Sequence, residues 1–165
     1  MNAHLFVSFD ELLAVVAMAL LAGLGGSSAG RRALFALPIV WLGGGVAGYL
    51  GRVTLLPAGV TSLSLLALGV LAAMNVRLTP WIATIVAAVV GFVHGWLNGA
   101  AIALAGREAY GLVGITGAVF VVAALVLGLV VSLRVPWTRI AVRVAGSWIA
   151  AIGLLLLGWT LSGRL

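Results

Sequence analysis

The stretch GFVHGWLNGAA, residues 91–101, places a histidine and an asparagine inside a segment that is otherwise typical of a membrane helix. His94 and Asn98 are four residues apart, so a helix puts them on the same face, one turn from each other. Ionisable side chains inside a membrane are costly, and they usually face the interior of a bundle and mark a site. The alternative interpretation is a His–Asn pair that only hydrogen-bonds neighbouring helices.

The other side chains with chemistry to offer lie near the start of the chain and in one loop. His4 precedes Asp10 and Glu11, which open an apolar run, and Glu108 follows Arg107 in AGREAYG. Each has an ordinary interpretation, since an acidic pair favours the positive end of a helix dipole and Arg107 and Glu108 can pair or be solvated. Together, imidazole and carboxylate without sulfur suit borderline divalent ions such as nickel, cobalt, zinc or copper.

The elements that position these side chains are membrane helices. Of the 165 residues, 64% are hydrophobic and 7% are charged, with a mean hydropathy of +1.32, whereas soluble domains carry about 25% charged residues. We predict an all-α, polytopic transmembrane helical bundle that forms a single domain over residues 1–165 within the lipid bilayer. The net charge of +6 comes from scattered arginines, a distribution that argues against a nucleic-acid partner. The absence of cysteine excludes disulfides and thiolate chemistry.

About six spans are expected from the apolar runs, near residues 10–26, 33–50, 61–76, 81–103, 111–133 and 140–161. A straight crossing of the ~30 Å hydrocarbon core takes about 20 residues, so the first and third runs are short. The connections are short as well, which predicts up-and-down neighbours in an antiparallel bundle.

The arginines predict the orientation of this bundle. Six of the nine fall on one side of the expected topology: Arg31, Arg32, Arg77, Arg134, Arg139 and Arg143. The positive-inside rule places that side in the cytoplasm. Both termini and all three acidic residues then face outward, in a multi-pass protein of the cell inner (plasma) membrane.

Glycines at regular spacing predict close helix contacts. Gly91, Gly95 and Gly99 recur every four residues and give the fourth span a smooth strip. In a membrane, where packing replaces the hydrophobic effect between helices, small residues at this spacing let two backbones approach. We assign these three glycines to helix packing.

Two stretches resemble the HupE/UreJ family, small polytopic membrane proteins associated with hydrogenase and urease loci and implicated in nickel or cobalt entry. HLFVSFDELLA, residues 4–14, is similar to the family pattern H-P-x-x-G-x-D-H-L-L-A and keeps His4 and Asp10. HGWLNGAA, residues 94–101, is similar to H-G-H-x-H-G-x-E and keeps His94. AYGLVG at 109–114 and the Leu-Pro step of the second span also resemble the family. The resemblance covers essentially the whole chain.

The chain also departs from these motifs. Glu11, Trp96 and Asn98 stand where the family has histidines, and Ala101 stands where it has glutamate. The resemblance therefore implies a reduced metal site, whose candidate ligands are His4, Asp10, Glu11, His94 and Asn98. Fewer imidazoles lower the expected affinity for nickel and copper and favour a harder or more weakly held ion.

Two functions remain open at this point. The first is binding or transport of a divalent metal ion through an outward-facing His/carboxylate site, with nickel or cobalt implied by the family. The second is a non-transporting structural or accessory subunit, assembled with partner membrane subunits or as a homo-oligomer. An enzyme is not expected, because there is no HExxH, no Gly-x-Ser-x-Gly and no carboxylate pair within the spans.

Overall fold

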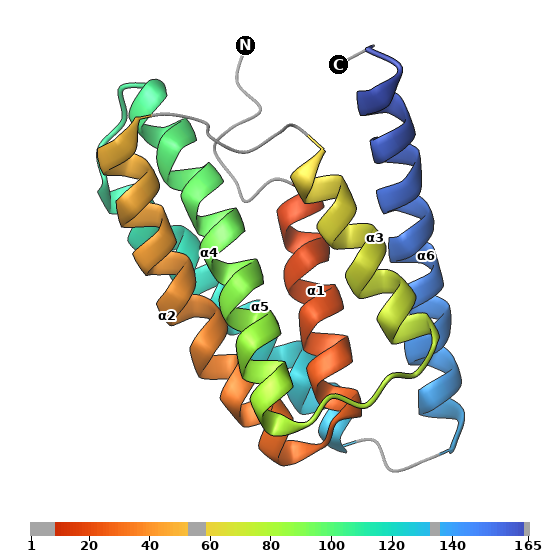
Figure 1. Cartoon of the computed structure of the whole chain (residues 1–165). Helices are drawn as coiled ribbons and strands as arrows, with labels where there is room; N and C mark the ends of the chain where they lie inside the picture. Colours follow the sequence, from red (N-terminus) through yellow and green to blue (C-terminus); the bar gives the residue numbers. More distant parts are fainter. Residues whose placement is uncertain (1–8, 53–58, 133–135, 164–165) are drawn as a thin grey trace.

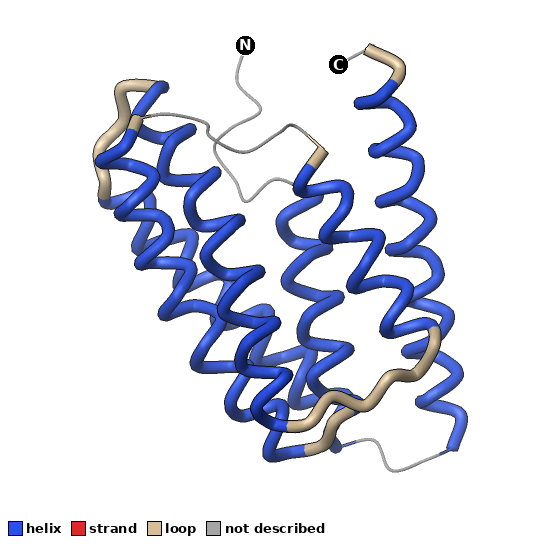
Figure 2. The backbone as a smooth tube through the Cα atoms, viewed as in Figure 1, coloured by secondary structure: helices blue, strands red, loops and turns tan. Residues whose placement is uncertain are grey.

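The protein is described by a computed structural model that covers residues 9–52, 59–132 and 136–163. Within these ranges the chain forms α-helices joined by loops, which confirms the predicted all-α fold (Figure 1, Figure 2). The helices are α1 (Phe9–Leu24), α2 (Ser27–Gly51), α3 (Val60–Ala73), α4 (Pro80–Leu104), α5 (Tyr110–Ser132) and α6 (Pro136–Leu161). Successive helices run in opposite directions, so α1 begins at the end of the bundle where α6 finishes (Figure 1).

Four of these helices, α2, α4, α5 and α6, are long and apolar enough to cross a membrane. The chain is thus a polytopic helical membrane protein. In contrast, α1 has 16 residues and α3 has 14. At 1.5 Å per residue they are only about 24 and 21 Å long, less than the ~30 Å hydrocarbon core. That α1 and α3 each cross the whole membrane stays a prediction. The orientation of the bundle in the membrane stays a prediction as well.

Local sequence signals set several helix ends. The Thr79 hydroxyl caps α4 by accepting a hydrogen bond from the Ile82 amide at 3.5 Å. Pro80 follows as the first helical residue, where its missing amide hydrogen costs nothing. Gly106, just after α4, has a φ of +65°, a left-handed conformation that glycine adopts without steric cost. These signals mark the start and the end of α4 and keep the connections on both sides of it short.

The closest contact in the bundle joins α2 and α4. Gly91, Gly95 and Gly99 all face the backbone of α2. A methyl group on Gly91 would lie 2.6 Å from the Leu37 carbonyl oxygen, and one on Gly95 would overlap the carbonyl oxygen of Trp41. The two backbones are therefore in direct contact, as small residues allow in membrane bundles.

A second glycine contact joins α3 and α6. A methyl group on Gly146 would lie 2.7 Å from the Ala73 amide nitrogen, and one on Gly153 would lie 2.5 Å from that of Leu66. The guanidinium of Arg143 also donates from Nε to the Ala73 carbonyl oxygen at 3.0 Å. This second pair holds the short α3 in place.

Helix α1 occupies the centre of the bundle. It contacts each of the other five helices, and most of its residues from Glu11 to Gly23 are buried. Its amino end lies deeper in the bundle than the ends of α2, α4 and α6 (Figure 1). The acidic residues that open α1 are thereby brought inside the bundle, beside the polar positions of α3 and α4.

Candidate functional site

A polar cluster forms where the amino end of α1 meets α3 and α4. It consists of Asp10 and Glu11 from α1, Ser64 from α3, and His94 and Asn98 from α4. His94 and Asn98 are both buried. We refer to these five residues as the polar cluster.

His94 is completely buried and has a defined hydrogen bond on one side only. Its Nε2 lies 2.9 Å from the Ser64 hydroxyl oxygen, and that hydroxyl donates its single proton to the Thr61 carbonyl oxygen at 2.7 Å. With the Ser64 proton on the Thr61 carbonyl oxygen, the Ser64 oxygen is the acceptor for His94, and we therefore assign the imidazole hydrogen to Nε2. The other nitrogen, Nδ1, is buried and is left with a lone pair of electrons that has no hydrogen-bond partner among the described residues. A neutral imidazole of this kind is a ready metal ligand.

Trp41 of α2 forms one wall of the site. Its indole stacks on the His94 ring, with centroids 5.5 Å apart and an angle of 21° between the planes. The Trp41 side chain is itself completely buried. This stack and the hydrogen bond to Ser64 together hold the His94 ring in one orientation.

Glu11 and Asn98 form the second polar contact of the cluster. With its amide nitrogen toward α1, Asn98 donates to both Glu11 carboxylate oxygens, at 2.8 and 3.3 Å. Both side chains are only 8% exposed. A buried carboxylate is tolerated when hydrogen-bond donors face it, and Asn98 supplies such a donor from the turn after His94.

Asp10 is half-buried at the amino end of α1. Its carboxylate lies within electrostatic range of the His94 imidazole. A cation bound at His94 would therefore also be attracted by the Asp10 carboxylate.

The predicted metal ligands are only partly brought together. Asp10 lies near His94, and Glu11 pairs with Asn98, whereas His4 lies outside the described residues. In the part of the chain that the structure describes, no three histidine or acidic side chains converge closely enough to hold a metal ion. The ligand set stays a prediction.

Two residues of the site were not anticipated from the sequence: Ser64 and Trp41. A signal for Ser64 was present, because Thr61, Ser62 and Ser64 interrupt an otherwise apolar run. Trp41 has no such signal, since an aromatic residue in an apolar span is usually part of the lipid-facing or core surface.

The helical bundle and its buried polar cluster define a polytopic membrane protein with a polar site in its interior. The family model described as HupE / UreJ protein matches residues 2–156. Protein HupE of Rhizobium leguminosarum bv. viciae is 30% identical over 159 residues, which is 93% of this chain and 81% of that protein. The chain belongs to the HupE/UreJ family, which confirms the family predicted from the sequence. No solved structure matches it.

Proposed function

We propose that this chain binds a divalent metal ion at the polar cluster and admits it into the membrane from the end of the bundle that carries the acidic residues. The observation that carries this proposal is the Nδ1 atom of His94, which is buried and lacks a hydrogen-bond partner among the described residues, in an imidazole within electrostatic range of the Asp10 carboxylate. Leaving a buried acceptor unsatisfied costs about 1–3 kcal/mol. A transient cation that coordinates Nδ1 would recover that cost.

The donor chemistry supports an ion of the nickel and cobalt class. Imidazole nitrogen with carboxylate oxygen and no thiolate suits borderline divalent ions. Nickel uptake is also the activity associated with the HupE/UreJ family, to which the chain belongs. The ion is cargo in this proposal, and the family is transporter-like rather than catalytic.

The surroundings of His94 suit a metal ligand. A ligating histidine usually donates its second ring nitrogen to a fixed acceptor, which sets its tautomer and orientation. Ser64 is in the position of that acceptor, and Trp41 holds the ring plane. Water, Glu11 or Asn98 would complete the coordination, and His4 remains a candidate ligand.

The distribution of charge supports entry from the acidic end. Asp10 and Glu11 open α1 and Glu108 lies in the α4–α5 connection, at the same end of the bundle (Figure 1). Carboxylates gathered at one end raise the local concentration of cations there. The opposite end carries Arg31, Arg32, Arg77, Arg139 and Arg143, so the positive-inside rule places the acidic end outside the cell, in the inner membrane.

The test is a metal-content measurement on the full chain, purified in mild detergent without chelator and equilibrated with nickel, cobalt, zinc or copper. We expect about one ion per chain in the wild type, by inductively coupled plasma mass spectrometry. The variants His94→Ala and Asp10→Asn should lose it. Glu108→Gln removes an exposed carboxylate from the same end, outside the polar cluster, and should bind as the wild type does.

A wild-type chain that retains none of the four ions would overturn the proposal. The accessory-subunit alternative would then gain support, and co-purification of a stoichiometric membrane partner would be its own positive evidence. If an ion is bound, uptake of that ion into proteoliposomes separates transport from binding alone.

A further inference from the structure

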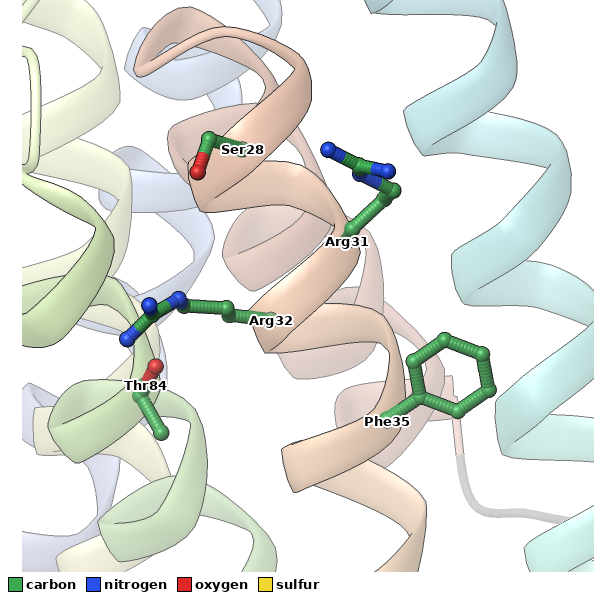
Figure 3. A pocket seen from close by; sticks show the side chains of 5 residues that line it. All are labelled: Ser28, Arg31, Arg32, Phe35 and Thr84. Atoms are coloured by element: carbon green, nitrogen blue, oxygen red, sulfur yellow. The ribbon is translucent and has the colours of Figure 1, made fainter.

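The arginine-rich end of the bundle has an open hollow between α2 and α4. Its volume is about 570 Å³, and it is lined by Ser28, Arg31, Arg32, Phe35 and Thr84 (Figure 3). The polar cluster lies toward the opposite end of α4, so this hollow is a separate feature.

Two guanidinium groups make the hollow strongly basic. Arg32 lies over the indole of Trp81, with its central carbon 4.5 Å from the ring centroid, which fixes the side chain against α4 by a cation–π contact. Arg31 leaves the same turn of α2 toward α5, and it lines both this hollow and the neighbouring space between α2 and α5 (Figure 3). All three acidic residues of the chain, Asp10, Glu11 and Glu108, lie at the opposite end. No aspartate or glutamate side chain therefore neutralises the pair.

An apolar groove adjoins the hollow and shares one residue with it. The groove has a volume of about 200 Å³, lies between α2 and α5, and has Arg31 among its lining residues. Gly30 and Leu34 of α2 and Leu127 and Gly128 of α5 form its walls. From Ser27 to Leu34 it follows two turns of α2, roughly 10 Å, away from the charged end.

We propose that these two features together bind an anionic phospholipid, with the phosphate at Arg31 and Arg32 and one acyl chain in the α2–α5 groove. Arginine pairs well with phosphate because its planar fork donates two parallel hydrogen bonds. A free phosphate ion could bind in the hollow but would make no contact with the apolar groove. The adjoining apolar groove is therefore what selects a lipid over an inorganic anion.

The position of the site in the membrane agrees with this ligand. The positive-inside rule places the arginine-rich end at the cytoplasmic leaflet, where anionic lipids attract basic residues. Trp81 and Phe35 are both exposed beside the arginines, and aromatic side chains are enriched at the level of lipid headgroups. The site does not involve the metal-binding residues, so the proposal stands apart from the proposed function.

The test is native mass spectrometry of the full chain in detergent, titrated with phosphatidylglycerol and, for comparison, with zwitterionic phosphatidylcholine. The double variant Arg31→Gln/Arg32→Gln should lower the affinity for phosphatidylglycerol roughly 30-fold, since each cation near an anionic lipid contributes about a factor of five. The matched control is Arg77→Gln/Arg139→Gln, which removes two exposed arginines from the same end. It should change the affinity by less than about threefold.

The groove is tested by a second substitution that leaves every charge in place. A Cβ on Gly128 meets no atom within 4 Å, so Gly128→Leu fills the groove without disturbing the packing inside the bundle. It should weaken phosphatidylglycerol binding but leave binding of inorganic phosphate unchanged. Gly117→Leu is the control on the same helix, since Gly117 also has open space around it and does not line the groove.

Equal losses in the two arginine double variants would overturn the proposal, because the lipid would then respond only to the general charge of this end. Equal affinity for inorganic phosphate and phosphatidylglycerol, with no effect of Gly128→Leu, would likewise exclude a lipid site. Selective loss in Arg31→Gln/Arg32→Gln together with loss in Gly128→Leu supports it. Size-exclusion elution and helix content confirm that each variant is folded.

Discussion

The Ser64 hydroxyl determines which nitrogen of His94 carries a hydrogen. It donates to the Thr61 carbonyl oxygen at 2.7 Å and lies 2.9 Å from His94 Nε2, so we assign the imidazole hydrogen to Nε2, with the Ser64 oxygen as its acceptor. Nδ1 is thereby left buried, with a lone pair that has no hydrogen-bond partner among the described residues. Helix α3 has no charged residue, yet through Ser64 it sets which nitrogen of His94 is available to bind a metal ion. Among the described residues, His94 is the one histidine of the bundle.

The first prediction concerns the substitution Ser64→Ala. It removes the acceptor for Nε2–H, so His94 loses the bond that fixes its tautomer. We expect ¹⁵N NMR of labelled histidine to show a new population with hydrogen on Nδ1. Affinity for the bound divalent ion should fall about 10- to 100-fold, the usual effect of losing such an outer-shell bond.

Two controls separate this effect from a general loss of packing. Ser64→Thr keeps the hydroxyl and should keep the wild-type imidazole spectrum. Ser147→Ala removes a hydroxyl that donates to the Arg143 carbonyl oxygen one turn back, on an exposed face of α6 away from His94. An unchanged His94 spectrum in Ser64→Ala would show that some other group fixes the tautomer.

The second prediction concerns the contact between Glu11 and Asn98. Asn98→Ala removes a donor from a buried carboxylate, which should destabilise the bundle by about 1–3 kcal/mol. Asn98→Asp should cost more, because it places a second carboxylate against Glu11. Thermal unfolding in detergent measures both.

A double-mutant cycle with Glu11→Gln is the control for this contact. In the Glu11→Gln background the charge is gone, so Asn98→Ala should cost clearly less than it does in the wild type. Coupling of about 0.5–3 kcal/mol is typical of residues in contact. Strictly additive losses would mean that the two side chains do not interact in the bilayer or detergent.

The helices could be predicted from the sequence because each apolar run is a local property. The fourth run was placed at residues 81–103, and α4 extends from Pro80 to Leu104. The prediction that the first and third runs are short is also confirmed, since α1 and α3 are the two shortest of the described helices. The length of an apolar segment depends only on residues that are neighbours in the chain. Helix-start residues such as Thr79 and Pro80 then mark its boundary.

The contacts of the site could be predicted only in part. Helical spacing placed His94 and Asn98 on one face, but they contact different partners, Ser64 on α3 and Glu11 on α1. Those partners depend on which faces of separate helices meet. For Trp41, the backbone contact between α2 and α4 is what brings its indole against the His94 ring. Spacing within one helix contains no information about such contacts, and a resemblance to family motifs does not supply it.

The third prediction uses Trp41 as a reporter of metal binding. Its indole is stacked on the His94 ring, at 5.5 Å between centroids, so a nickel or copper ion at Nδ1 would quench its fluorescence by proximity. We expect saturating quenching that follows ion binding and amounts to at most the share of one of the six tryptophans. In Trp41→Phe the specific component should disappear while the ion is still bound.

Zinc provides the comparison for this experiment, because its filled d-shell does not quench in the same way. Trp148→Phe removes an exposed tryptophan of α6 and should leave the quenching intact. Quenching that persists in Trp41→Phe would place the ion elsewhere in the protein.

The fourth prediction concerns the backbone contact of α2 and α4, which holds Trp41 against His94. A methyl group on Gly95 would overlap the Trp41 carbonyl oxygen, and backbone cannot turn aside as a flexible side chain can. Gly95→Ala should therefore separate the two helices and destabilise the bundle by about 1–3 kcal/mol. Gly43→Ala is the matched change on α2, where a methyl group meets no atom within 4 Å. Because alanine favours a helix over glycine by about 0.5–1 kcal/mol, Gly43→Ala should leave stability unchanged or raise it. Thermal unfolding in detergent compares the two, and equal behaviour would show that α2 and α4 are not in backbone contact at Gly95.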